Sequence, residues 1–415
     1  MGSPFFDTKG FPMRAGTKPG RRLLPLAAVM VAALAIAFTA VQAQDTGGFK
    51  TLKALQSERV SLAKALSPSI VAIAASRPNL SGDQQTGMAG SMAQADSGFV
   101  VDGDYVVTCI EAQALNGQGA DGLMKIGDKV WMMAHDGTEF SGKVVGRDRR
   151  NLLLLVKMDE GHPKLPSLKF GDSDASPMGT TAIGLGNSLD SLLIDRTINF
   201  SYGTVSGFYR FEPIDVMHPE DENTGGDPYK GNVLEVDVAV HQGDHGGPIV
   251  NLNGEVIGMM NGHFMAGRHM GCAVPSNQIR AVLPQLKKGV PEDELSQGWL
   301  GFKAKKPADD SRIFISEVEA DGPAAKAGIK VGHELVRVDN YRIPEIGRLR
   351  EMLGVGLVMR KRRVGGGMFG QAREVEVPVS YGVPVGTHIQ LTLRDTATGK
   401  EMTVDLVVGE KAEDF

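Results

Sequence analysis

Short apolar runs that end at glycine, aspartate or asparagine are the feature that most constrains the fold of this chain. They follow one another between residues 69 and 258, and no long helical pattern separates them. Short strands with regular turn signals are typical of antiparallel barrels and sandwiches, so we predict a mainly β fold. The runs occupy residues 69–73, 97–101, 105–107, 129–132, 142–145, 152–156, 181–184, 234–238, 248–250 and 255–258.

The composition agrees with a β protein rich in turns, since glycine accounts for 53 of 415 residues and aromatic residues for 6%. Lysine and arginine number 44 against 49 aspartates and glutamates, so the net charge of −5 lacks the basic footprint of a nucleic-acid-binding protein. The only cysteines, Cys109 and Cys272, exclude a disulfide scaffold and a four-cysteine zinc site. The sequence leaves open whether they pair. We expect Cys109 to be a small buried residue, with a nucleophile as the alternative.

Two local patterns predict a turn and a helix. The sequence Asn-Leu-Asn-Gly at 251–254 predicts a hairpin turn, because Asn-Gly tolerates a positive φ. Residues 277–288 predict a helix with Ser276 as its N-cap and Gly289 just past its end. The glycine-, serine- and glutamine-rich stretch 77–96 predicts a mobile loop.

The N-terminal segment departs from the pattern of a soluble protein. Residues 23–40 are apolar and uncharged, basic residues precede them, and Val41 and Ala43 place small side chains at positions −3 and −1 of a cleavage site. This order is typical of a secretory signal. An uncleaved membrane anchor at 23–43 is an alternative because about 20 apolar residues span a bilayer, and a buried core helix is a third interpretation. Signal and anchor both predict that the rest of the chain lies outside the cytoplasm.

The most informative motif is Gly-Asp-His-Gly-Gly-Pro at 243–248, which lies between two apolar runs. A tight glycine turn of this kind directs successive backbone N–H groups into one pocket, where they bind an oxyanion. In this setting the sequence resembles the HtrA/DegP family of trypsin-like serine proteases, which has Gly-Asn-Ser-Gly-Gly-Pro at this place. The resemblance implies an oxyanion-type turn at Gly243, Asp244 and His245. It also places His245 where the family has its nucleophilic serine.

The other two positions of the catalytic triad are also substituted. The family carries Thr-Asn-Asn-His after a short apolar strand, and this chain has Thr-Cys-Ile-Glu at 108–111, so Glu111 stands where the base histidine belongs. The family's Asp-Leu-Ala-Val-Leu-Lys corresponds to a stretch that begins at Asn151, which replaces the orienting aspartate. A serine protease needs a hydroxyl activated by an imidazole that a carboxylate orients. The resemblance therefore implies a serine-endopeptidase fold with no intact catalytic residue, which is a pseudoprotease.

The substituted residues leave several interpretations of the cleft open. If the fold is kept, His245 lies near Glu111, and we favour a hydrogen-bonded pair of the two. A metal site is an alternative, because His241, His263 and His269 are close in sequence and imidazoles with a carboxylate ligate zinc. No short motif such as His-Glu-x-x-His is present, so we predict no cofactor and no metal. Acid–base catalysis by the pair is a further alternative.

A second domain begins near Trp299. The stretch 321–333 contains Pro-Ala-Ala-Lys-Ala-Gly and resembles the short helix and glycine cap of a PDZ domain. The resemblance implies that Leu300, Gly301 and Phe302 form the loop whose N–H groups hold a peptide C-terminal carboxylate, while the peptide adds to the sheet edge. A domain kept only for assembly is the alternative.

The PDZ pattern is altered in three places. His333 replaces the usual aspartate, and Asn340 replaces a turn glycine whose backbone asparagine tolerates. Residues 354–383 resemble an insertion, and this insertion holds Arg-Lys-Arg-Arg at 360–363. We predict an exposed insertion, with contact to acidic lipid or to an acidic partner as the alternative.

Together these features predict a double antiparallel β-barrel of the trypsin or chymotrypsin type, followed by a PDZ-like α+β domain. The predicted parts are a basic tail at 1–22, a signal peptide or membrane anchor at 23–43, an N-terminal helix or linker at 44–66, the two-barrel domain at 67–290, a linker at 291–298, and the PDZ-like domain at 299–412 with the insertion 354–383.

The expected function is that of an exported, proteolytically inactive HtrA-like protein in the periplasm or cell envelope. Its expected partners are peptide C-termini or unfolded proteins, and it would serve protein quality control as a chaperone, an adaptor or a regulator of an active HtrA-like relative. The alternatives are an enzyme with residual or rebuilt hydrolytic activity and a scaffold that binds no peptide. The family implies a homo-trimer assembled through N-terminal aromatic residues, of which only Phe49 follows the signal. We expect no nucleic-acid partner.

Overall fold

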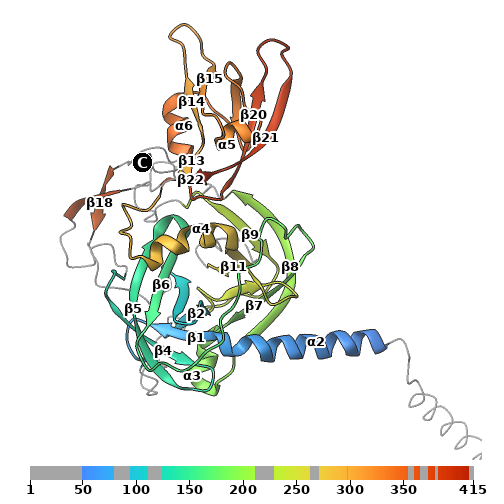
Figure 1. Cartoon of the computed structure of the whole chain (residues 1–415), viewed down its shortest axis with the longest axis vertical. Helices are drawn as coiled ribbons and strands as arrows, with labels where there is room; N and C mark the ends of the chain where they lie inside the picture. Colours follow the sequence, from blue (N-terminus) through green and yellow to red (C-terminus); the bar gives the residue numbers. More distant parts are fainter. Residues whose placement is uncertain are drawn as a thin grey trace, which may run out of the picture. The chain divides into compact units, whose positions relative to one another are not determined.

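The chain divides into two compact units, residues 1–60 and residues 61–415. The predicted tail and signal peptide or anchor lie outside the described residues, as do Glu111, His263 and His269. Within the described ranges, no helix is both long enough and apolar enough to cross a membrane. This computed structural model describes residues 49–78, 94–110, 124–210, 229–261, 271–296, 298–353, 359–364, 373–378 and 382–410 (Figure 1).

The first described element is helix α2 (Lys50–Leu66), which confirms the helix predicted within 44–66. Its last turn belongs to the second unit, where Leu66 is buried and Leu62 packs against the same core. The short 3-10 helix η2 (Ser67–Ser69) then leads into the first strand.

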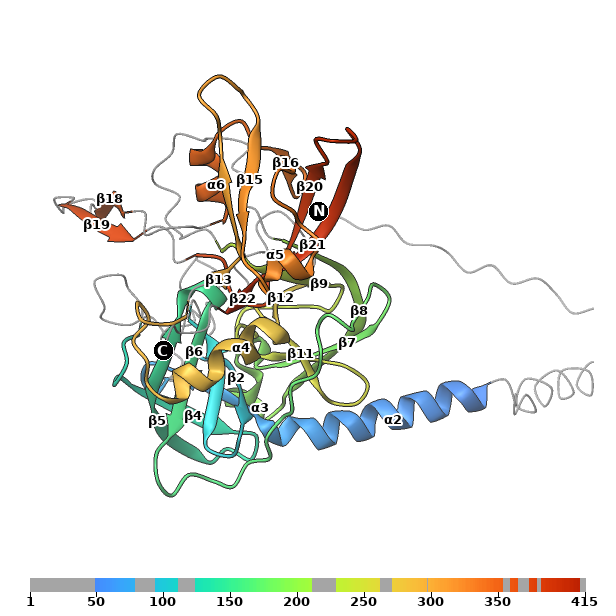
Figure 2. The same ribbon diagram turned by 45° about the horizontal axis from the view of Figure 1, so that its top comes forward.

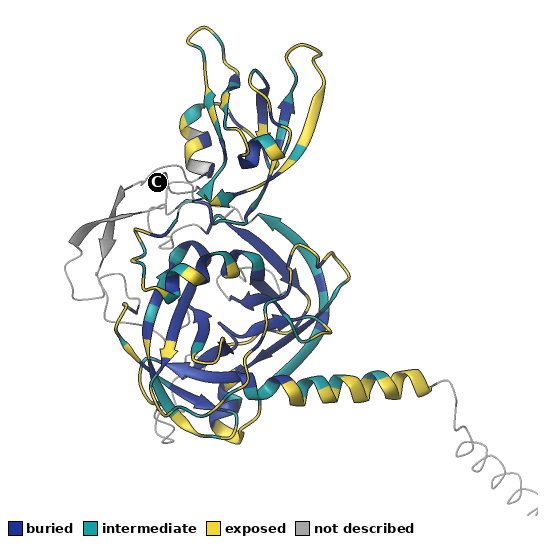
Figure 3. Ribbon diagram, viewed as in Figure 1, coloured by how far each residue is buried: buried dark blue, intermediate teal, exposed yellow. Residues whose placement is uncertain are grey.

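Six of the predicted runs form the strands of the first barrel, which is closed in the order β1-β2-β3-β6-β5-β4 (Figure 1). Every residue of β1 and β2 is buried, because a small closed barrel fills its interior with side chains (Figure 3). The elements are β1 (Ile70–Ala74), β2 (Asp96–Val101), β3 (Tyr105–Cys109), β4 (Lys129–Ala134), β5 (Glu139–Asp148), the 3-10 helix η5 (Arg149–Asn151) and β6 (Leu153–Met158).

The second barrel is closed in the order β10-β11-β12-β9-β8-β7, which confirms the predicted double-barrel fold. Four of its strands coincide with predicted runs, whereas β8 and β12 do not. Its elements are β7 (Thr181–Gly186), the 3-10 helix η6 (Ser188–Asp190), α3 (Ser191–Asp195), β8 (Asn199–Arg210), β9 (Asn232–Val236), β10 (Pro248–Val250), β11 (Val256–Met260) and β12 (Gly271–Pro275).

The predicted hairpin turn and helix are both present. Gly254 has a φ of 75° in the turn between β10 and β11. Helix α4 (Ser276–Lys287) follows β12, and Gly289 lies just past it with a φ of 69°. The predicted N-cap is wrong: Ser276 is the first helical residue, and its hydroxyl donates to the Gly171 carbonyl (3.0 Å) instead of capping the helix.

The C-terminal part is an α+β domain built on the sheet β14-β15-β16-β20-β21, with β17 paired to β16. Two short strands, β13 and β22, join its beginning to its end, and β13 starts one residue before the predicted boundary at 299. The elements are β13 (Gly298–Trp299), β14 (Phe302–Lys305), β15 (Ile313–Val318), α5 (Pro323–Lys326), β16 (Glu334–Val338), β17 (Tyr341–Arg342), α6 (Ile346–Leu353), β18 (Met359–Val364), β19 (Arg373–Pro378), β20 (His388–Arg394), β21 (Glu401–Val407) and β22 (Gly409–Glu410).

Details of this domain refine the sequence predictions. The left-handed residue of the β16–β17 turn is Asp339 (φ 52°), not Asn340. Asp339 suits this place because its Oδ1 accepts a hydrogen bond from the Gln390 backbone N–H (3.0 Å). His333 is buried, and its Nδ1 accepts a hydrogen bond from the Lys330 backbone N–H (3.3 Å), so it serves as a turn acceptor in place of an aspartate.

The predicted insertion contains a two-stranded hairpin of β18 and β19. Their register places Lys361 opposite Glu376 and Arg363 opposite Glu374. Most of the rest of 354–383 lies outside the described residues.

The predicted linker at 291–298 is attached to the first barrel. The Glu292 carboxylate accepts a hydrogen bond from the Arg147 guanidinium (2.6 Å), and both side chains are largely buried. Arg150 Nη1 donates to the Ser296 carbonyl (2.6 Å). The segment before the PDZ-like domain is therefore fixed by specific hydrogen bonds.

Candidate functional site

The turn at 243–248 joins β9 to β10 and is fixed to β2 of the other barrel. The Ser97 hydroxyl donates to the Gly243 carbonyl (2.6 Å), and the Ser97 backbone N–H donates to the His245 carbonyl (3.0 Å). Gly243 and Gly246 have φ angles of 90° and 83°, which residues with side chains rarely adopt. The turn therefore lies where the two barrels meet.

Two amides of this turn are available to a ligand. Within the described part of the chain, neither the Gly243 N–H nor the His245 N–H donates a hydrogen bond. Backbone N–H groups of a glycine turn form anion-binding concavities. The predicted oxyanion role of this turn stays a prediction.

Asp244 braces the turn. Its carboxylate accepts hydrogen bonds from the Ser188 hydroxyl (2.7 Å) and the His241 backbone N–H (2.8 Å). Burial raises the pKa of Asp244, and these hydrogen bonds lower it in part. These hydrogen bonds connect the turn to η6 through the Asp244 carboxylate, so we assign Asp244 a structural role.

His245 lies near a carboxylate that the sequence analysis did not identify. Its Nδ1 is 3.9 Å from Oδ1 of Asp96, which is longer than a hydrogen bond, and its side chain is 16% exposed. Burial lowers the pKa of His245, so the imidazole is neutral at neutral pH. Asp96 is the first residue of β2. The signal that could have found it is an ionisable residue directly before the predicted run 97–101.

The end of the predicted mobile loop 77–96 is fixed in place. The backbone N–H groups of Gln94 and Ala95 donate to the Asp190 carboxylate (2.8 and 3.0 Å). Asp96 belongs to a buried strand. For these three residues the prediction of a mobile loop is wrong, because a carboxylate from η6 supplies acceptors for their backbone. Residues 79–93 lie outside the described residues.

Asn151, at the predicted position of the orienting carboxylate, faces another acid. Its Nδ2 donates to Oδ2 of Asp148 (2.7 Å), and Asp148 also accepts from Nε of Arg150 (3.1 Å). Asn151 Oδ1 is buried and has no hydrogen-bond partner among the described residues. No hydrogen bond or ion pair joins Asn151 to His245 within that part of the chain. The predicted triad position therefore holds a neutral amide that is hydrogen-bonded within its own segment.

Glu111 lies outside the described residues, so its pairing with His245 stays a prediction. The strand that leads to it ends at Cys109, whose Sγ accepts a hydrogen bond from Nδ2 of Asn261 (3.2 Å). Cys109 and Cys272 are not joined in a disulfide, and each is 1% exposed. Where the structure describes the chain, no three histidine, cysteine, aspartate or glutamate side chains gather as metal ligands.

The predicted carboxylate loop turns sharply at Gly301, which has a φ of 73°. The Leu300 carbonyl accepts from the Ala324 N–H (3.0 Å), and the Gly301 carbonyl accepts from the Glu319 N–H (2.9 Å). Strand β14 begins at Phe302 and is an edge strand, paired with β15 alone among the described strands. An extended peptide can therefore add to its other edge.

Comparisons with known proteins agree with this architecture. The family model described as a trypsin-like peptidase domain matches residues 96–259, and the one described as a PDZ domain matches residues 291–354. A probable periplasmic serine endoprotease, DegP-like, from Rickettsia conorii is 29% identical over 265 residues, which is 61% of this chain and 48% of that protein. Its counterpart from Pseudomonas putida is 30% identical over 275 residues, 62% of this chain and 50% of that protein.

The solved structure of the serine endoprotease from Yersinia pestis aligns with 85% of this chain and 98% of that chain, at 18% identity and a TM-score of 0.41. The chain spans about half the length of the curated relatives it matches. The peptidase match includes the turn at 243–248, and the PDZ match includes the loop at 300–302. With its two closed barrels followed by a PDZ domain, and with these relatives, the chain is HtrA/DegP-like: a trypsin-like peptidase domain followed by a PDZ domain.

Proposed function

We propose that this HtrA/DegP-like protein does not cleave peptide bonds and instead binds peptides or unfolded proteins. The proposal is supported by His245, which lies in a well-braced turn at the place where the sequence resemblance puts the nucleophilic serine. A neutral imidazole accepts a proton, but acyl transfer by a serine-type protease requires a hydroxyl next to it. Neither His245 nor Asn151 supplies the group that the reaction needs at its position.

The loss in kcat that these replacements would cause is too large for useful proteolysis. Removing the serine or the histidine of such a triad costs about a millionfold in kcat, and the separate losses overlap because the residues act as a unit. Without a triad, two amides that bind an oxyanion, together with substrate binding, accelerate the reaction only about 10³- to 10⁴-fold over its rate in water. The amides of Gly243 and His245 therefore support binding of a carbonyl or an anion, not protease-level catalysis.

The PDZ domain supports the binding half of the proposal. The loop at 300–302 offers backbone donors for a C-terminal carboxylate, and the edge of β14 offers a place for an extended chain. The relatives are described as periplasmic, which supports a location outside the cytoplasm. We infer a chaperone, an adaptor or a regulator of an active HtrA-like relative in protein quality control.

The first test compares the natural protein with the triple variant Glu111→His, Asn151→Asp, His245→Ser on an unfolded protein substrate. We expect no cleavage by the natural protein and a gain of about 10³-fold or more in the variant. Circular dichroism and urea unfolding confirm that each variant is folded. Cleavage by the natural protein that survives gel filtration and is lost in His245→Ala would overturn the proposal in favour of a rebuilt active site.

The second test addresses peptide binding with two matched glycines. A Cβ at Gly301 would lie 3.0 Å from Cδ of Pro323, whereas a Cβ at Gly328 would have no atom within 4 Å. Both glycines have positive φ angles, 73° and 77°, so the two alanine variants share the backbone strain. We expect Gly301→Ala to weaken the binding of C-terminal peptides about tenfold or more, and Gly328→Ala to leave it unchanged. No binding by the natural protein across a C-terminal peptide library would favour a scaffold.

A further inference from the structure

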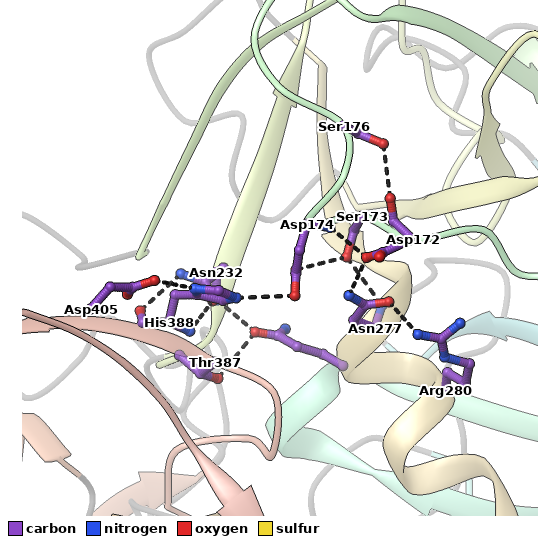
Figure 4. A network of polar contacts seen from close by, with 11 residues as sticks. Asp172, Ser173, Asp174, Ser176, Asn232, Asn277, Arg280, Thr387, His388 and Asp405 are labelled. Atoms are coloured by element: carbon purple, nitrogen blue, oxygen red, sulfur yellow. Dashed lines mark hydrogen bonds and ion pairs between the residues drawn. The ribbon is translucent and has the colours of Figure 1, made fainter. Parts of the chain in front are cut away.

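The PDZ domain is joined to the second barrel by a polar network around His388, the first residue of β20 (Figure 4). The backbone N–H of His388 donates to Oδ1 of Asn232 (2.6 Å), and the His388 carbonyl accepts from Nδ2 of the same residue (3.1 Å). Asn232 begins β9 and is 1% exposed. One buried asparagine of the peptidase domain thus pairs with the PDZ backbone through both ends of its amide.

Gln278 of α4 extends this contact. Its Oε1 accepts hydrogen bonds from the Thr387 hydroxyl (3.1 Å) and from the Asn232 N–H (2.8 Å). Its Nε2 donates to the hydroxyl of Tyr229 (2.5 Å). Gln278 and Thr387 are 1% and 0% exposed, so both ends of the Gln278 amide are paired at a buried site, which favours one defined arrangement of the junction.

The ring of His388 lies between two carboxylates, one from each domain (Figure 4). Its Nδ1 is 2.7 Å from Oδ2 of Asp405 on β21, and its Nε2 is 3.1 Å from Oδ2 of Asp174 in the connection between β6 and β7. A neutral imidazole has one N–H and one lone pair, whereas an imidazolium has two N–H groups. Both nitrogens can therefore face carboxylates favourably only when the ring is protonated.

Other charged groups around His388 have partners of their own. Arg210 of β8 forms a second ion pair across the junction, 2.7 Å from Asp339. Phe208, also on β8, packs against the His388 ring at 5.7 Å between centroids and 85° between planes. Three more charged groups lie on the neighbouring elements: Asp172 accepts from Asn277, Arg280 donates to Asn277, and Glu235 accepts from Tyr209.

We propose that protonated His388 is a clamp that holds the PDZ domain on the peptidase domain, and that loss of its proton loosens the junction. Deprotonation would leave the carboxylate of Asp174 or Asp405 facing a lone pair, so one ionic contact would become repulsive. The proposal goes beyond peptide binding, and it holds whether or not the peptidase cleft is active.

The pH range follows from the two partners. The contact with Asp174, 3.1 Å from Nε2, raises the pKa of His388 to about 9, against the effect of burial and with the help of Asp405. When the domains separate, Asp174 is lost and the pKa of His388 falls toward its ordinary value of about 6.5. The clamp is therefore fully present below about pH 6.5 and is lost as the pH rises through about 9.

The acid side of the range is set by Asp174. Burial alone would raise the pKa of Asp174, but the nearby His388 and Asn277 side chains bring it below its ordinary value. The carboxylate therefore stays charged at mildly acidic pH, so acidification in that range does not release the clamp.

The test follows the distance between the domains in the full chain by fluorescence energy transfer. Leu252→Cys in the second barrel and Val331→Cys in the PDZ domain give exposed labelling sites, because the native side chains are 56% and 62% exposed. The native thiols are buried. We expect steady transfer up to about pH 7 and a change as the pH passes about 9, with docking weakened on the order of tenfold or more.

In His388→Gln the energy transfer should have the value of the loosened junction at every pH. In Asp174→Asn the junction should loosen at a pH at least about one unit lower than in the natural protein. His162→Gln is the matched control, because His162 pairs with Asp104 within the first barrel (3.4 Å) and should keep the natural profile.

A second readout is the NMR titration of His388 in the folded chain. A pKa near 9 that falls in Asp174→Asn supports the clamp. A His388 pKa of about 6.5 in the natural protein, or a transfer profile that is flat to about pH 10 and unaffected by His388→Gln, would overturn it.

Discussion

The cleft at the 243–248 turn and the junction around His388 are held together in different ways. The turn is held within the peptidase domain, by positive-φ glycines, by the hydrogen bonds of Ser97 to two turn carbonyls and by the Asp244 carboxylate. At the junction the side chains of Asn232, Gln278 and His388 connect the two domains. None of the contacts that hold the turn uses the side chain of His245, whereas the junction depends on side chains that reach from one domain to the other.

The two histidines show the same contrast in their charge. The side chains of His245 and His388 are buried to a similar degree, 16% and 21% exposed. Burial lowers the pKa of His245, whereas the ionic contact with Asp174 raises the pKa of His388 to about 9. The partners decide the direction, because Asp96 lies 3.9 Å from one nitrogen of His245 and carboxylates lie within 3.1 Å of both nitrogens of His388.

Gly246→Ala should have the largest effect, because it breaks the cleft through its backbone. The residue has a φ of 83°, and a Cβ would lie 2.3 Å from the Thr108 hydroxyl, 2.4 Å from the Ser97 carbonyl and 2.8 Å from the Cys109 N. Two of these atoms are backbone and cannot move aside. We expect a loss of about 3 kcal/mol or more in the free energy of unfolding, measured with urea.

Gly254→Ala is the control for that measurement. Gly254 also has a positive φ, 75°, but the nearest atom to a Cβ would be the side-chain Cδ2 of Leu66 at 3.1 Å. We expect a loss of about 1–2 kcal/mol in the free energy of unfolding. Equal losses in the two variants would mean that left-handed strain alone, and not the close contact between the barrels, holds the turn.

Asn232→Ala should have the next largest effect, because it removes the main contact of the junction. The His388 N–H and carbonyl would both lose their partner at a buried site. We expect a loss of about 2–3 kcal/mol and a shift in the energy transfer between the domains. The matched change in the cleft is Asn151→Ala, which removes one hydrogen bond and should cost about 1 kcal/mol without moving the PDZ domain. A larger loss of stability in Asn151→Ala than in Asn232→Ala would contradict this order.

Asn151→Asp should cost about 1–2 kcal/mol near neutral pH, because it brings a second carboxylate to within hydrogen-bond distance of Asp148. Repulsion raises the pKa of the new acid in the folded state, so the penalty is present above the unfolded pKa of about 4 and disappears below it. Urea unfolding at pH 3.5 and 7 measures this. If the loss of stability is the same at pH 3.5 and pH 7, it comes from the missing hydrogen bond alone and not from repulsion between the carboxylates.

Local patterns predicted much of the fold. The apolar runs, the Asn-Gly turn at 251–254 and helix α4 depend on nearby residues, and the motif at 243–248 marks a turn whose glycines are required by its own backbone. The prediction of Ser276 as the N-cap was wrong because its hydroxyl donates to the carbonyl of Gly171, which is distant in the sequence.

The partners of the site residues were not predictable in this way. Asp96 was assigned to a loop, and only the packing of one barrel on the other brings it near His245. The junction combines Asn232, Gln278 and His388 from three separate segments that share no motif. Sequence patterns located the turn at 243–248, and the tertiary fold determined which groups face it.

His245→Gln should have the smallest effect, below about 1 kcal/mol, with a pH dependence opposite to that of His388→Gln. Because burial lowers the pKa of His245, the unfolded chain binds a proton below about pH 6.5 that the folded protein does not. The natural protein should therefore lose stability relative to His245→Gln as the pH falls from about 7 to 5.

For His388→Gln the natural protein keeps its full advantage below about pH 6.5 and loses it as the pH rises through about 9, because the folded pKa is raised. Urea unfolding of both variants at pH 5, 7 and 9.5 separates the two profiles. If the profiles run parallel, Asp96 already pairs with a protonated His245 in spite of the 3.9 Å separation. The cleft and the junction would then share one electrostatic design, and the proposal of a neutral imidazole at the nucleophile position would have to be abandoned.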